Sequence, residues 1–173
     1  MKRLSLFVVA LAFVAVGCSK SSTSPSTPTN PTFTATLSAA NEVPPITGAE
    51  AGGRGDATIT FVVTKDAAGN ITAATVTFVA NLNSFPPGTQ ITLAHIHEGA
   101  AGVGGPVRIG TTLTAAQPLV LTNGTGTINS PASGTVDVAV VQAIINNPAG
   151  FYFNAHSTLN GGGVVRGQLV KVS

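Results

Sequence analysis

The stretch DATITFVVTKDAAGNITAATVTFV, residues 56–79, decides the fold class of this 173-residue chain. Apolar and polar side chains alternate in both halves of the stretch, as in a β-strand with one face buried and the other in water. Residues 66–70 (DAAGN) separate the two halves, and their residue types favour a tight turn. We therefore predict a β-hairpin over residues 56–79.

The same alternation continues on both sides of the hairpin, with short apolar runs and glycine-rich turns between them. Further strands are predicted over residues 33–37, 90–97, 106–110, 118–121, 124–129, 150–157 and 164–172. Many short strands of this kind are typical of an antiparallel sandwich or barrel. The predicted fold class is all-β, with a Greek-key-like antiparallel sandwich or barrel.

One segment near residue 140 breaks the strand pattern. Val136, Val140 and Ile144 have helical spacing, and Asn-Asn-Pro at 146–148 ends the run. We predict one short helix over residues 136–146. Two strands in series are the alternative, because valine and isoleucine are at home in either structure.

The N-terminus has the pattern of an export signal. A basic start and a stretch of 13 residues that is apolar except for Ser5, too short to span a bilayer, predict a signal peptide over residues 1–17. Small residues before Cys18 resemble the lipobox of bacterial lipoproteins, in which this cysteine carries lipid; an ordinary signal peptide with an incidental cysteine is the alternative. In a Gram-negative cell, Ser19 resembles the pattern sorted to the outer membrane.

The rest of the chain divides into a linker and one domain. Residues 18–32 hold Cys18 and a Ser/Thr/Pro-rich linker that cannot bury a core, and residues 33–173 are long enough for a single core. We expect an exported domain that Cys18 anchors through lipid to the cell envelope. Because Cys18 is the only cysteine, no intrachain disulfide forms.

The charge pattern excludes nucleic acid as a partner. The whole chain has formal net charge +2, and Lys2 and Arg3 leave with the signal peptide, so the mature charge is zero. No basic cluster follows residue 3, and aromatic residues are too sparse for a base-stacking surface. The expected partners are the membrane, through Cys18, and a protein or surface ligand whose identity the sequence leaves open.

The three histidines form the most distinctive polar pattern. His95 and His97 are two residues apart in a predicted strand, so their side chains lie on one face, and His156 lies in a later predicted strand. Three neutral imidazoles that meet at one point suit copper or zinc, with water as a fourth ligand. The alternative is a hydrogen-bonded cluster that ties the histidines to Glu42, Glu98 or backbone carbonyls.

Three further polar residues are candidates for a supporting role around these histidines. Glu42 precedes two prolines, which hold it in a fixed place, where it can accept from Arg166 or a histidine or remain a solvated loop carboxylate. Arg166 lies within an apolar strand, where a structural ion pair is the commoner role. Asn154 is expected to satisfy neighbouring backbone groups.

Four motifs then resemble the CHRD domain, a module first noticed in chordin and common in bacterial secreted proteins. They occur in the family's order and are LSAANEVPP at 37–45, AHIHEG with GPV at 94–107, FYFNAHS at 151–157 and GVVRGQL at 163–169. The resemblance implies a β-sandwich without an established enzymatic activity.

The order of His-x-His, a glycine-rich loop, a later histidine and a C-terminal arginine is also similar to Cu,Zn superoxide dismutases. By that similarity His95, His97 and His156 would be copper ligands, and Arg166 would guide the substrate. The chain has no further histidine for a bridging ligand. No catalytic residue is predicted, since no Ser-His-Asp or Cys-His arrangement is found.

Two functions follow from the sequence. The first is a non-enzymatic binding or structural module of the cell envelope, and the alternative is a metal-binding envelope protein with a three-histidine copper or zinc site. The candidate site residues are His95, His97 and His156 for the metal, Glu42, Asn154 and Arg166 around it, and Cys18 for lipid.

Overall fold

The computed structural model describes residues 30–172, so the predicted signal peptide and the predicted lipidation site, Cys18, lie outside the described residues. All the strands belong to one antiparallel sheet. They are β1 (Thr32–Ser38), β2 (Arg54–Lys65), β3 (Ile71–Asn83), β4 (Thr89–Glu98), β5 (Val107–Gly110), β6 (Leu119–Leu121), β7 (Gly126–Pro131), β8 (Phe151–Ser157), β9 (Val165–Gln168) and β10 (Val170–Lys171).

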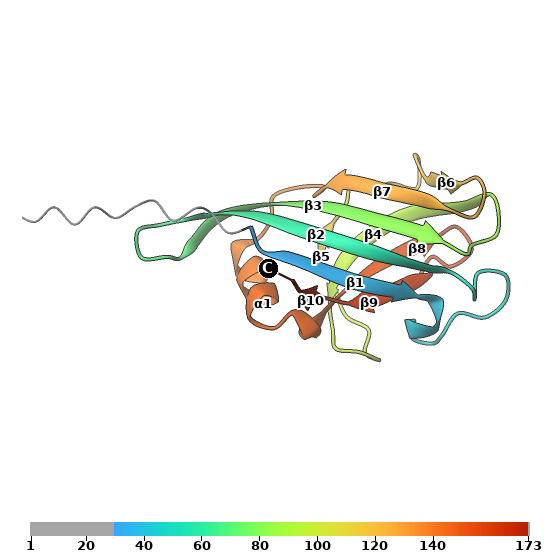
Figure 1. Ribbon diagram of the computed structural model, residues 1–173, viewed down its shortest axis with the longest axis horizontal. Coiled ribbons are helices and arrows are strands. Elements are labelled where there is room, and N and C mark those ends of the chain that lie inside the picture. Colours follow the sequence, from blue (N-terminus) through green and yellow to red (C-terminus); the bar gives the residue numbers. More distant parts are fainter. Residues whose placement is uncertain (1–29, 173) are drawn as a thin grey trace, which may run out of the picture.

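The sheet follows the order β5-β4-β8-β9-β1-β2-β3-β7, while β6 pairs with β4 and β10 with β1. It curls into a half-barrel (Figure 1), and a bridge between Thr111 and Ala132 brings together the chain just beyond β5 and β7. The all-β, antiparallel prediction is confirmed. No helix within residues 30–172 is long and apolar enough to cross a membrane.

The predicted hairpin is formed by β2 and β3, and its alternation separates two faces. Ile59 pairs with Phe78 in register, and both side chains are fully buried inside the curl. Thr58, one position away, points to the outer face and is exposed. Phe33 packs edge-on against Phe61, with ring centroids 5.8 Å apart, so the core is closed by aromatic rings from the first two strands.

The helix and the last strand differ slightly from the prediction. The helix α1 spans Val138–Asn146 and begins after Asp137, whose side chain accepts from the backbone N–H of Ala139 at 2.8 Å. The single strand predicted over 164–172 is interrupted at Leu169, whose side chain is buried in the core and whose N–H donates to Phe151. Before Leu169 the strand pairs with both β8 and β1, and beyond it β10 pairs with β1 alone.

Strand β8 is covered on both faces. Every residue of β8 is buried, although its sequence alternates large apolar and polar side chains. One face packs on the core through Phe153 and Ala155, and the opposite face carries Asn154 and His156. Asn154 and His156 are therefore buried on the outer side of the sheet, away from the apolar core.

Candidate metal centre

The strand register brings the three histidines together. β4 and β8 are antiparallel neighbours, in which His95 pairs with Asn154, Leu93 with His156 and His97 with Tyr152. Paired residues and residues two apart share a face, so all three imidazoles stand on the outer side of the sheet. Ala94 and Ile96, on the other face of β4, are fully buried in the core.

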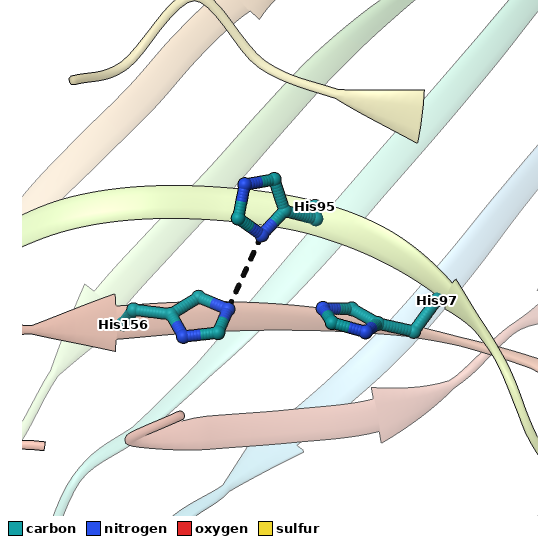
Figure 2. Close-up of side chains that lie close together, drawn as sticks. All are labelled: His95, His97 and His156. Atoms are coloured by element: carbon teal, nitrogen blue, oxygen red, sulfur yellow. Dashed lines mark hydrogen bonds between the residues drawn. The ribbon is translucent and has the colours of Figure 1, made fainter. Parts of the chain in front are cut away.

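Figure 2 shows the three rings turned toward one another, with His95 on β4 above His156 on β8. One nitrogen from each histidine lies within 4.8 Å of the other two. His95 Nδ1 and His156 Nε2 are 3.2 Å apart, close to the roughly 3.3 Å that separates two ligands of one tetrahedral zinc ion. The wider separations, of up to 4.8 Å, would have to shorten toward this value for the cluster to enclose a metal ion.

Two of the rings are held by the backbone. His97 Nδ1 lies 2.9 Å from the carbonyl oxygen of Gly105, and His156 Nδ1 lies 3.0 Å from that of Gly161. A carbonyl oxygen only accepts, so each Nδ1 carries the proton and donates it. Each Nε2 then keeps its lone pair, and that of His97 is buried without a hydrogen-bond partner among residues 30–172.

The surroundings keep all three imidazoles neutral. Burial lowers the pKa of His95 to about 4, and the neighbouring His156 and His97 add to the effect. Burial also lowers the pKa of His97 and of His156, against the bonds to Gly105 and Gly161 that favour the charged forms. Neutral imidazole is the form that binds a metal ion, so the lone pairs are available at pH 7 without loss of a proton.

A CHRD domain model matches residues 33–169, which is most of the chain. The chain belongs to the CHRD family. No curated protein and no solved structure matches it. The predicted family is thus confirmed.

Sequence reasoning missed Tyr152, which supports His97 in this CHRD domain. The Tyr152 ring stacks on the His97 ring, with centroids 4.9 Å apart and an interplanar angle of 8°. On the other side of Tyr152, the Arg166 guanidinium carbon lies 3.5 Å from the ring centroid, a cation–π contact. The signal was in the sequence, because Tyr152 is two residues from Asn154 and four from His156, and so shares their face.

Arg166 is buried and holds the loop over this stack. Its Nη2 donates to the carbonyl oxygens of Ala100 at 3.2 Å and Val103 at 3.0 Å. The same loop carries Gly105, whose N–H donates to the Tyr152 hydroxyl at 3.2 Å. A side chain at position 105 would overlap the backbone oxygen of Glu98, so only glycine lets this carbonyl reach His97.

Glu42 and Asn154 lie beside the three-histidine cluster rather than in it. Both are more than nine-tenths buried, and each has one oxygen without a hydrogen-bond partner among residues 30–172. Burial raises the pKa of Glu42 to about 7, although Arg166 and a hydrogen bond from Asn154 act in the opposite direction. Glu42 also lines two surface cavities, of about 630 and 330 Å³, which connect it to solvent.

The remaining charged candidate near the histidines lies apart from them. Glu98 follows His97 directly but points outward, where it accepts from Arg108 Nε at 2.7 Å. Both side chains of this pair are largely exposed. The alternative to metal binding was a cluster in which hydrogen bonds tie the histidines to Glu42, Glu98 or backbone carbonyls. It applies only in part, since His97 and His156 bond to backbone carbonyls while His95 bonds to another imidazole.

Proposed function

We propose that this CHRD-domain protein binds one copper or zinc ion through His95, His97 and His156. The observation that carries the proposal is the convergence of three imidazole nitrogens within 4.8 Å, two of them aimed by bonds to backbone carbonyls. Metal-binding histidines typically donate their second ring N–H to a carbonyl or carboxylate in this way.

The donor set selects the class of metal. Imidazole suits copper, zinc and nickel, whereas magnesium and calcium require several oxygen ligands. Neither a carboxylate nor a thiolate belongs to the cluster within the described part of the chain. Nitrogen sites have a higher intrinsic affinity for copper than for zinc, so copper is expected to bind more tightly and zinc to compete with it for the same site.

We propose metal binding rather than dismutation as the role of the site. The dismutase similarity would need Arg166 beside the metal, free to guide an anion. Its Nη2 instead donates to Ala100 and Val103, and the Tyr152 ring lies between its guanidinium and His97. This arrangement favours a structural arginine and a non-enzymatic binding module.

The proposed setting is the cell envelope. The signal-like N-terminus, Cys18 and the Ser/Thr/Pro-rich linker support an exported domain tethered by lipid at a membrane surface. Cell fractionation tests this setting, since Cys18→Ser is expected to move the protein from the membrane to the soluble fraction. A protein that stays with the membrane in that variant would contradict lipid anchoring at Cys18.

The metal content of the purified protein tests the proposed function. The protein is loaded with copper or zinc, desalted and analysed beside a His95→Ala/His97→Ala variant. Near-stoichiometric metal is expected in the wild type and none in the variant. Glu98→Ala is the matched control, because Glu98 adjoins His97 in sequence but faces solvent, and it should retain the metal. Absence of retained metal in the wild type would refute the proposal.

A further inference from the structure

The three histidines of the proposed site are not held equally. His97 and His156 are buried, with exposed fractions of 8% and 6%, and each donates to a loop carbonyl. The His97 ring is also held in place by the Tyr152 ring stacked on it. His95 is half-buried, and its ring bonds to the His156 imidazole rather than to a loop carbonyl.

The neighbouring strand leaves room beside His95. Gly110 on β5 is its register partner on the side away from β8, so β5 itself places no side chain beside the ring. A Cβ added at Gly110 would lie 3.4 Å from His95 Cδ2 and 3.0 Å from Ser133 Oγ, the end of an exposed side chain that can turn aside. His95 therefore has an open flank on which its ring can turn, while the two other rings cannot move without breaking backbone bonds.

We infer that His95 is an exchangeable ligand and that the protein is a metal carrier, which hands its ion to an acceptor through the open side at His95. This inference rests on the proposed metal binding and adds a direction of transfer. The acceptor has imidazole or thiolate donors, since these compete for the same class of metal.

The transfer is a ligand substitution without a change of oxidation state. A donor atom of the acceptor forms a bond to the metal while the bond from His95 Nδ1 breaks, so the coordination number is kept. Once the ion has left, His95 Nδ1–H donates to the lone pair of His156 Nε2, the 3.2 Å contact seen here. The proton moves from Nε2 to Nδ1 of His95 through solvent, so the net charge of the histidine cluster does not change.

The first test ranks the three ligands by zinc affinity in His95→Ala, His97→Ala and His156→Ala variants of the whole protein. Orienting bonds of the kind made by His97 and His156 are worth about 10- to 100-fold in metal affinity. Loss of His95 is therefore expected to cost about 10- to 100-fold less affinity than loss of either of the others. Equal losses, or the largest loss at His95, would overturn the inference. Thermal melting of the metal-free variants shows that each is folded.

The second test keeps all three ligands. Zinc release from the loaded protein is followed with the chelator 4-(2-pyridylazo)resorcinol at several concentrations, in the wild type and in Gly110→Ala. The wild-type rate should rise in proportion to chelator, and the added methyl beside His95 should slow release several-fold without loss of stoichiometric zinc. A rate independent of chelator, or unchanged in Gly110→Ala, would contradict transfer at His95.

The two proposals fail in different ways in these experiments. A wild-type protein that retains no metal refutes both of them. A wild-type protein that retains zinc, but shows equal ligand losses or chelator-independent release, refutes only the carrier inference and leaves metal binding intact.

Discussion

Replacement of Glu42 by glutamine is expected to stabilise the protein at alkaline pH. The carboxyl group is buried, and burial raises its pKa from 4.5 to about 7. The folded protein thus holds a proton that the unfolded chain has released between these two pH values. The stability that protonated Glu42 contributes to the wild type is fully present below pH 4.5 and is lost as the pH rises through 7.

The size of the effect follows from the shift in pKa. Each pKa unit is worth about 1.4 kcal/mol, so the wild type loses about 3 kcal/mol through Glu42 between acidic and mildly alkaline pH. Glutamine has nearly the same shape and no charge to bury, so this loss disappears in Glu42→Gln. The stability difference between variant and wild type should therefore grow by about 3 kcal/mol from pH 4.5 to pH 8.

Urea unfolding of both proteins at a series of pH values, with chelator present, measures this difference. The histidines also titrate in this range, but they are common to both proteins and cancel in the comparison. Arg166 is the charged group that acts on Glu42, and residues 39–49 around it contain no other charge. A difference that is constant across the pH range would refute the assignment of a raised pKa to Glu42.

Glu50 is a matched control for this substitution. It is also buried, but its Oε2 accepts from Ser157 Oγ and from Asn160 Nδ2, both at 2.6 Å. Glu50→Gln weakens two charge-assisted hydrogen bonds and should destabilise the protein by about 1–3 kcal/mol. The contrast separates loss of a buried charge that is only partly compensated, at Glu42, from loss of a well-bonded one, at Glu50.

Three further predictions concern the site and the helix. Tyr152→Leu removes the ring that stacks on His97 and should weaken zinc binding about 10- to 100-fold, whereas Tyr152→Phe keeps the stack and should bind zinc nearly as tightly as the wild type. Calorimetric titration with zinc measures both affinities. Equal affinities of the two variants would show that the stack does not position His97. Zinc retention should stay constant from pH 8 down to 6.5, because the lowered histidine pKa values keep protons from competing; loss of zinc already at pH 7 in equilibrium dialysis would contradict neutral, desolvated ligands. Asp137→Ala should cost about 1 kcal/mol in urea unfolding by removing the N-cap of α1, and no change would show that the cap is replaced by water.

The sequence predicted the strands because period-2 alternation is a local signal. The hairpin over 56–79 is found as β2 and β3, which extend beyond it at both ends. The break at Leu169 was not predicted, since the residues on both sides are strand-forming and only the pairing with β8 and β1 decides where one strand ends. Local pattern carries no information about which partner a strand chooses.

The candidate site was predicted in its residues but not in its placement. The face on which His95 and His97 lie could not be decided, because the pattern of β4 has no clear alternation. The proximity of His156 depends on the register of β4 with β8, about 60 residues later in the chain. The hold on His97 and His156 comes from backbone carbonyls of glycine loops, which leave no signature in residue type.

X-ray absorption spectroscopy of the copper- or zinc-loaded protein tests the central claim most directly, because it counts and identifies the atoms bound to the metal. The three-histidine site predicts imidazole scattering from three nitrogen ligands at about 2.0–2.1 Å. A spectrum dominated by oxygen ligands, without the outer-shell scattering of imidazole rings, would contradict the assignment of His95, His97 and His156 as the metal site.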